Sequence, residues 1–165
     1  MSKAPSHNPP AVAGDTVGAL IEWGSQQLES AGVSFGHGTT NAHDEAAWLV
    51  LWRLGLPLDS DLSDAPESIK NKPVAPAEKA LVATLFEERI ASRKPAAYLT
   101  REAWLQGVPF YVDERAIVPR SFIAELLVDG SVDDFLSDRT HRVLDLCTGN
   151  GSLAVLAAMA WPEVE

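Results

Sequence analysis

The chain has 165 residues, of which 46% are hydrophobic and 22% charged, a composition typical of a globular protein with one or two small domains. Its net charge of −10 repels phosphate backbones, which argues against direct DNA binding and suits a basic protein partner, although solubility alone also explains an acidic surface. The single cysteine, Cys147, excludes a disulfide framework. No apolar run approaches the roughly 20 residues that span a bilayer, so we expect no membrane association and predict a cytoplasmic protein.

A disordered leader is predicted over residues 1–14, followed by a helical module over residues 15–94. Apolar residues recur at helical spacing in three segments, over 15–31, 40–55 and 76–92, with capping or turn-forming residues at their ends. Helices of this length bury their apolar faces only by packing on one another. The sequence therefore predicts a small helical bundle.

The third predicted helix has a clear division between core and solvent. The apolar residues Leu81, Leu85 and Phe86 are expected to face inward. The charged side chains that follow are expected on the solvated side; they are Glu87, Glu88 and Arg89.

Residues 95–120 are rich in aromatic and β-branched residues and are broken at Gly107. This pattern predicts a β-hairpin or two short strands, which would link the helical module to the next domain. Trp104, Phe110 and Tyr111 are interpreted as packing residues of the hairpin.

The last part of the chain has the order strand, tight loop, helix. After a short helix predicted over 121–128, the apolar run at 143–146 is typical of a buried strand, and the Ala- and Leu-rich segment 152–161 of a helix. This order opens a doubly wound, Rossmann-like fold, so the predicted class is mixed α/β. A complete domain of this class needs roughly 100 to 150 residues more. Residues 121–165 are therefore predicted to be the incomplete start of such a domain.

The loop DLCTGNG, between the predicted strand and helix, carries the chemistry. Gly149 and Gly151 permit tight turns and close approach of a ligand. The Asp145 carboxylate would repel the pyrophosphate of a dinucleotide, but it can attract the ammonium and sulfonium of S-adenosylmethionine. The loop thus favours S-adenosylmethionine over NAD, while Asp145 can also order the loop by accepting from backbone N–H groups. The cofactor-binding residues predicted in the loop are Asp145, Cys147, Thr148, Gly149, Asn150 and Gly151.

Cys147 stands at the first glycine position of the common pattern D-x-G-x-G-x-G. We interpret it as a small buried side chain, because nothing near it in sequence would activate a nucleophilic thiol. No metal site is predicted, because the four histidines lack metal-ligand spacing; they are His7, His37, His43 and His141.

Two segments, PAAYLTREAWLQGVPFYVDERAIVPRS and RVLDLCTGNGSLAV, resemble the HemK-like protein-glutamine methyltransferases. Within that family, EAW, FYVDER, VPRS and DLCTG are most similar to the branch that methylates large-subunit ribosomal protein three. The sister branch, which methylates peptide-chain release factors, usually has AYLTGE, a DLGTGSG-type loop and PRPETE. The resemblance extends from about Ala11 to Glu165, with departures at Phe122, where proline is frequent, and Asn150, where serine is common.

The resemblance implies a helical substrate-recognition module joined by a hairpin to an S-adenosylmethionine-dependent enzyme. It also implies methyl transfer to a glutamine amide nitrogen of a basic ribosomal protein of the large subunit. The family's N-P-P-Y motif is absent, since Asn8-Pro9-Pro10 is followed by Ala11, so we predict no catalytic residue in this segment and no activity from it alone. Arg120, on the segment that approaches the cofactor pocket in the family, is added to the predicted cofactor-binding residues. It could instead hold the hairpin against the domain.

The sequence leaves three alternative functions. Methylation of a release factor is the nearest alternative, and a non-catalytic module that binds a ribosomal protein is an alternative of another class. An NAD-type Rossmann protein is disfavoured by Asp145 and by the upstream motifs.

Overall fold

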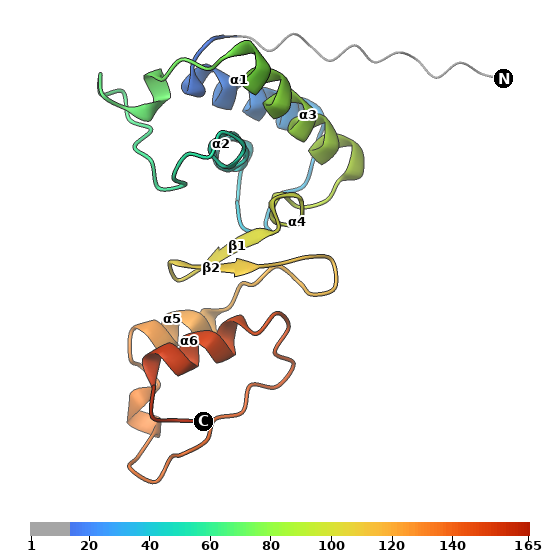
Figure 1. Ribbon diagram of the computed structural model, residues 1–165. Coiled ribbons are helices and arrows are strands. Elements are labelled where there is room, and N and C mark those ends of the chain that lie inside the picture. Colours follow the sequence, from blue (N-terminus) through green and yellow to red (C-terminus); the bar gives the residue numbers. More distant parts are fainter. Residues whose placement is uncertain (1–13) are drawn as a thin grey trace, which may run out of the picture. The chain divides into compact units, whose positions relative to one another are not determined.

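The computed structural model describes residues 14–165, so residues 1–13 of the predicted leader lie outside the described part. The chain divides into two compact units, unit 1 (residues 1–96) and unit 2 (residues 97–165). The described residues form six α-helices and a two-stranded antiparallel sheet (Figure 1), which confirms the mixed α/β class. None of these helices is long and apolar enough to cross a membrane.

Unit 1 contains the three predicted helices. They are α1 (Val17–Ser30), α2 (Ala42–Arg53) and α3 (Pro76–Ser92), with a short 3-10 helix, η1 (Ile69–Asn71), before α3. Their ends follow from capping chemistry: the Thr16 hydroxyl accepts from the Ala19 N–H, and the Asn41 side chain accepts from the Asp44 N–H. Each predicted helix of the module is therefore confirmed to within a few residues.

The core of unit 1 lies where α1 packs on both α2 and α3. Fully buried side chains come from all three helices, among them Leu20, Leu49 and Phe86. The Trp23 and Phe86 rings meet edge to face, with centroids 5.4 Å apart. The helices thus close one apolar core, as expected for a bundle of this size.

Arg89 contradicts the prediction that it would face solvent. Its side chain is buried, with only 1% of the residue exposed. The Arg89 Nε donates to Oε1 of Glu45 at 2.6 Å, and Nη2 donates to the Ser34 carbonyl at 3.0 Å. Glu45 is itself buried, and its Oε2 accepts from the Thr39 hydroxyl at 3.0 Å. A buried guanidinium is tolerated here because a buried carboxylate on α2 offsets its charge.

Leu81 is the second correction on α3, because it is exposed rather than inward-facing. The buried positions of α3 are Val82, Ala83, Leu85, Phe86 and Arg89, which follow the three- and four-residue spacing of one helix face. Leu81 lies off that face. Leu81 was predicted to face inward because it is apolar. Packing against α1 and α2 decides which side of α3 faces the core.

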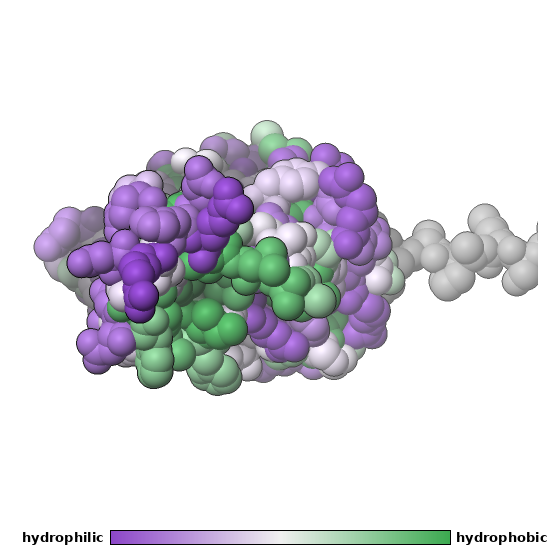
Figure 2. Space-filling view, turned by 90° about the horizontal axis from the view of Figure 1, so that it is seen from below, coloured by the Kyte–Doolittle hydropathy of each residue, from purple (hydrophilic) through white to green (hydrophobic). Residues whose placement is uncertain are grey.

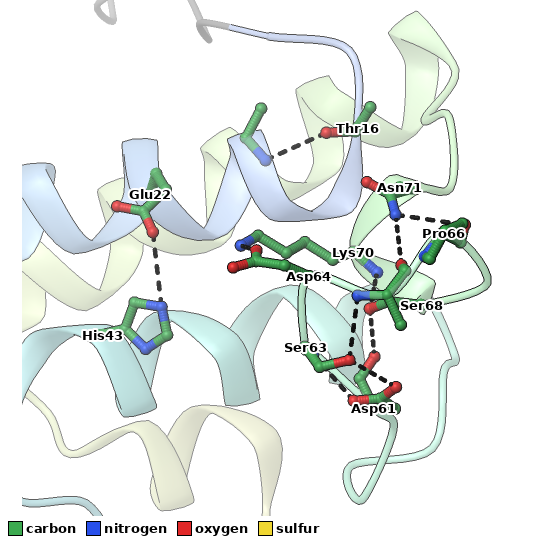
Figure 3. Close-up of polar contacts among 12 residues, drawn as sticks. Thr16, Glu22, His43, Asp61, Ser63, Asp64, Pro66, Ser68, Lys70 and Asn71 are labelled. Atoms are coloured by element: carbon green, nitrogen blue, oxygen red, sulfur yellow. Dashed lines mark hydrogen bonds and ion pairs between the residues drawn. The ribbon is translucent and has the colours of Figure 1, made fainter.

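The connection from α2 to α3 is held by polar contacts of its own (Figure 3). The Ser68 hydroxyl donates to the Asp61 carbonyl at 2.8 Å, and Lys70 pairs with Asp64 at 2.6 Å. On the helices nearby, His43 Nε2 lies 3.7 Å from the Glu22 carboxylate. The contacts of Ser68 and Lys70 order the connection between the two helices.

Unit 2 contains the predicted hairpin and both predicted helices. Its elements are α4 (Ala96–Thr100), which begins at the unit boundary, β1 (Glu102–Leu105), β2 (Val108–Tyr111), α5 (Phe122–Val128), the 3-10 helix η2 (Asp133–Phe135) and α6 (Ser152–Ala160). The helix α4 was not predicted. It was missed because its five residues are too few for helical periodicity to show.

The hairpin turns through two residues, Gln106 and Gly107, which have φ of 51° and 75°. Positive φ at both positions is the geometry of a type I′ turn, which matches the twist of paired strands. The turn fixes the register in which Leu105 lies opposite Val108 and Trp104 opposite Pro109. Side chains therefore alternate between two faces of the hairpin.

The two faces of the hairpin have different environments. Phe110 belongs to the core of unit 2, together with Ala124, Leu127, Leu156 and Trp161. Partly buried Leu105 and Val108 pack against this core from the same face. Trp104 and Tyr111, on the other face, are 49% and 58% exposed. The prediction that all three aromatic residues pack is thus confirmed for Phe110 and wrong for the other two.

Candidate functional site

The candidate cofactor loop, residues 145–151, leads into the N-terminus of α6. Cys147, Thr148 and Gly149 are exposed, whereas Asp145 and Asn150 are partly buried. The first N–H groups of a helix have no acceptor inside the helix, and they carry the positive end of the helix dipole. The loop therefore presents exposed backbone next to backbone donors, as a ligand-binding loop must.

Three residues of the loop have positive φ: Cys147 at 61°, Gly149 at 59° and Gly151 at 84°. Glycine adopts this left-handed conformation at little cost, but an L side chain is strained there by about 1 kcal/mol or more. Cys147 is exposed as well as strained, so the expectation of a buried side chain at this position is wrong. The conformation explains why a glycine would suit the position better.

Asn150 ties the loop to the hairpin and to α6. Its Nδ2 donates to the Tyr111 carbonyl at 3.4 Å, and its Oδ1 accepts from the Ser152 N–H at 3.3 Å. The Gly151 N–H donates to the Thr148 carbonyl at 2.9 Å, which closes a turn within the loop. Asn150 therefore acts on the loop through positioning, because both of its contacts are within the protein.

Asp145 lines a hollow of about 130 Å³ beside α6. The other lining residues are mostly apolar, and they are Val143, Ala154, Ala157, Ala158, Trp161, Val164 and Glu165. The Asp145 Oδ2 is buried and has no hydrogen-bond partner among the described residues. An unpartnered carboxylate oxygen costs free energy unless a donor reaches it, so this atom is a natural acceptor for a ligand or for water.

The predicted strand at 143–146 is not formed. These residues belong to no helix or strand, and Leu144 and Leu146 are 79% and 75% exposed rather than buried. A parallel strand is buried and defined by neighbours on its edges and by helices on its faces. The described residues supply one such neighbour at most, so the apolar run stays unpaired over most of its length.

One contact nevertheless has the pattern of a parallel sheet. The Glu165 N–H donates to the His141 carbonyl at 3.0 Å, and the Val143 N–H donates to the Glu165 carbonyl at 2.8 Å. Glu165 thus bonds to His141 and Val143, the residues on either side of Arg142. This is the pattern by which two residues pair in a parallel sheet. An ion pair between Arg142 and Glu165, at 3.6 Å, joins the same two residues. Segment 141–143, α6 and Glu165 are thus connected as in a βαβ unit.

Arg120 lies one residue before Ser121, whose side chain caps α5. Its side chain is exposed. Residues 145–151 form one continuous loop, but Arg120 belongs to the connection between β2 and α5. Its part in cofactor binding therefore stays a prediction.

The chain is similar to proteins named ribosomal protein uL3 glutamine methyltransferase. It is 49% identical over 150 residues to that of Burkholderia pseudomallei, 46% over 152 residues to that of Bordetella pertussis and 45% over 153 residues to that of Neisseria meningitidis serogroup A. Each alignment covers 90% or 91% of this chain. The chain is homologous to this family. No family model matches it.

The chain spans about half the length of the curated relatives it matches, since 47% to 49% of each relative is aligned. The similarity confirms the resemblance to protein-glutamine methyltransferases and, within them, to the branch that acts on large-subunit ribosomal protein three. A methyltransferase family implies a methyl donor, which is the coarse form of the cofactor prediction; the residues that bind the donor stay a prediction.

The loop fits S-adenosylmethionine on two observations. Gly149 and Gly151 have no atom within 4 Å of the position a Cβ would take, so the backbone is open to a ligand. The unpartnered Asp145 Oδ2 can accept from an ammonium group, whereas next to a phosphate it would be repelled.

No group of three or more metal-ligating side chains occurs in residues 14–165.

Proposed function

We propose that the protein to which this chain belongs transfers a methyl group from S-adenosylmethionine to a glutamine side-chain amide of ribosomal protein uL3. The observation that carries the proposal is the identity of 45% to 49%, over nine tenths of the chain, to relatives named for that activity. The glycine loop before α6 supports it, because it offers a site for the methyl donor.

The proposed cofactor residues have separate roles. Asp145 accepts from the ammonium group of the cofactor, and the backbone around Cys147, Thr148, Gly149 and Gly151 lies against it. Asn150 holds this backbone in place through the Tyr111 carbonyl. Arg120 contributes a positive charge that can pair with acidic groups around the site. The bound cofactor supplies an electrophilic methyl on a sulfonium, and the residues of this chain bind and orient it.

The proposed substrate is a basic protein, and the chain is acidic, with a net charge of −10. Opposite net charges speed association and favour encounter of the correct partners. In this proposal unit 1 is the substrate-recognition module, the hairpin is the linker and the segment from 121 onward starts the methyltransferase domain. The protein acts in the cytoplasm, where ribosomal proteins are made.

The names of the relatives favour uL3 over release factors as substrate. A non-catalytic role for the 165-residue chain on its own is compatible with the same similarity, because the chain contains no N-P-P-Y motif. We therefore expect the chain alone to show no turnover.

The test is a methyl-transfer assay with the complete reading frame of the gene. Labelled S-adenosylmethionine is incubated with unmethylated uL3 and, in parallel, with an unmethylated release factor. Label on a glutamine of uL3, located by mass spectrometry, is the expected result. Label on the release factor alone would show that the sister activity is the correct one, and label on neither would overturn the proposal.

Variants of Asp145 test the cofactor site separately. Asp145→Asn in the complete protein should weaken S-adenosylmethionine binding about tenfold, as expected for loss of a charge-assisted hydrogen bond. Asp138→Asn, an exposed carboxylate of the same unit, is the matched control and should leave the dissociation constant unchanged. Equal affinities of the two variants, measured by calorimetry, would remove Asp145 from the site.

A further inference from the structure

The hairpin has an exposed aromatic face that the proposed chemistry does not use. Because Glu102 pairs with Tyr111 and Trp104 with Pro109, these four side chains lie on the face of the hairpin opposite Phe110. We call this set, Glu102, Trp104, Pro109 and Tyr111, the aromatic face. A hairpin that packs one face on a core normally turns polar side chains to solvent on the other. Three of the four side chains here are aromatic or proline, which is typical of a binding surface.

The polar ends of both rings are satisfied from within the hairpin. The Trp104 Nε1 donates to the Glu102 carboxylate at 2.7 Å, and the Tyr111 hydroxyl donates to Oδ2 of Asp113 at 3.0 Å. These bonds fix the orientation of the rings and place a carboxylate at the edge of each. The flat faces of the rings are therefore held in place before any partner arrives, which lowers the entropic cost of binding.

Among the described residues, the Asp113 carboxylate is paired with a cation, and the Glu102 carboxylate is not. Arg115 donates to both oxygens of Asp113, at 2.7 to 3.0 Å, and this guanidinium holds the pKa of Asp113 well below its usual range. The Asp113 charge is thus offset by a neighbouring cation. Within residues 14–165, the Glu102 carboxylate accepts from the Trp104 indole and has no ion pair. The aromatic face therefore combines an indole ring with an unbalanced negative charge at its edge.

An indole face beside a carboxylate matches the chemistry of an arginine or lysine side chain. A guanidinium can stack on the ring and bond to the carboxylate at the same time, and an ammonium can do so as a point charge. The surroundings have the matching sign, because unit 2 has eleven acidic residues and five arginines. We propose that the aromatic face binds an extended segment of the protein substrate through an arginine or lysine over Trp104. The identity of that substrate as uL3 rests on the proposed function.

The experiment is a titration of the 165-residue chain with unmethylated uL3, and with a short arginine-rich peptide and its citrulline counterpart as probes of charge. We expect Trp104→Ala to weaken uL3 binding about tenfold, as for loss of a partly desolvated cation–π contact. Glu102→Gln should weaken it about threefold. Trp104→Phe keeps a ring face and should retain binding to within about threefold. Phe135→Ala removes another exposed aromatic side chain of unit 2 and should change nothing.

Two further measurements distinguish binding of a basic segment from uncharged binding and from self-association. Binding should weaken as salt rises, and the citrulline peptide should bind far more weakly than the arginine peptide. Unchanged binding of Trp104→Ala, equal binding of the two peptides, or self-association of the chain that Trp104→Ala abolishes would each overturn the inference.

The proposed function is tested independently with the complete protein. If the inference is correct, Trp104→Ala raises KM for uL3 and leaves kcat unchanged, because the contact binds substrate away from the reacting methyl. If the complete wild-type protein does not methylate uL3, the proposed function fails, and the binding titration still decides whether the aromatic face takes a basic segment.

Discussion

The two units use charged and apolar residues in opposite ways. Unit 1 buries its large apolar side chains between three helices and even closes a salt bridge, Arg89–Glu45, inside its core. Unit 2 leaves Phe122, Leu144 and Leu146 exposed. Buried polar atoms without a partner among the described residues occur in both units, at Trp23, Trp48 and Arg89 in unit 1 and at Asp145 in unit 2. The face shown in Figure 2 includes a broad apolar area bordered by polar side chains. Substitutions in the closed core of unit 1 should lower its stability. Exposed apolar side chains in unit 2 can instead be stabilised when a ligand or another protein segment covers them.

The largest expected effect lies in unit 1, at the buried ion pair. Arg89→Ala should lower the free energy of unfolding by about 3–5 kcal/mol, because Glu45 would be left as an uncompensated buried charge. Urea unfolding monitored by circular dichroism measures this loss. Arg93→Ala is the matched control, since that arginine is exposed and its side chain donates to the Ala31 carbonyl, and it should cost less than about 1 kcal/mol.

The double variant Arg89→Met, Glu45→Leu sharpens the same point. Removing both charges together should restore most of the stability lost by Arg89→Ala, because no desolvated charge remains. If Arg89→Ala costs no more than Arg93→Ala, the pair is not buried in solution and the contrast between the units is lost.

Two glycines of α1 give the next largest effect. A Cβ on Gly24 would overlap the buried ring of Phe86, and we expect Gly24→Ala to cost about 2 kcal/mol through overpacking. A Cβ on Gly18 would overlap the Lys70 Cγ and lie 3.2 Å from the Lys70 carbonyl oxygen. Because the closest contact is with a partly exposed side chain rather than a buried ring, Gly18→Ala should cost less than Gly24→Ala. Thermal unfolding of the two variants compares them directly, and equal melting temperatures would contradict the packing described for the core.

In unit 2, Cys147→Gly should stabilise the loop. Glycine at a φ of 61° relieves about 1 kcal/mol of backbone strain, whereas Gly149→Ala, at 59°, should introduce a similar strain. Hydrogen exchange of the loop and of the first turn of α6 reports both effects. Opposite signs for the two variants support the loop geometry, and a destabilising Cys147→Gly would contradict it.

The smallest effect is expected at the exposed leucines. Leu144→Asn should change the free energy of unfolding by less than about 0.5 kcal/mol, because the side chain is already in water. The same substitution at Leu49, fully buried in α2, should cost several kcal/mol. Leu144→Asn should also reduce light scattering at high concentration. A large loss of stability at Leu144 would show that this residue is covered in solution.

The sequence was sufficient for the elements whose signals are local. Helix bounds in unit 1 followed from periodicity and from capping residues, which the structure identifies as Thr16 and Asn41. The hairpin followed from composition and Gly107. The glycine loop was located from DLCTGNG alone, and both of its glycines have positive φ, while its role in cofactor binding stays a prediction. The four-residue spacing of the hydrophobic pattern does not, however, fix the rotation of a helix to within one residue. For this reason Leu81 and Arg89 were assigned to the wrong sides of α3.

The local chemistry of consecutive residues determined where the chain forms helices, turns and a hairpin, and it is the basis for proposing a cofactor loop. Tertiary structure alone decided which side chains those elements bury. Arg89 is inside because Glu45, 44 residues away in the sequence, meets it. Trp104 is outside because a two-residue turn sets the register that gives Phe110 to the core. Residues 144–146 remain unpaired because a strand forms only beside a neighbouring strand, which the segment alone does not specify.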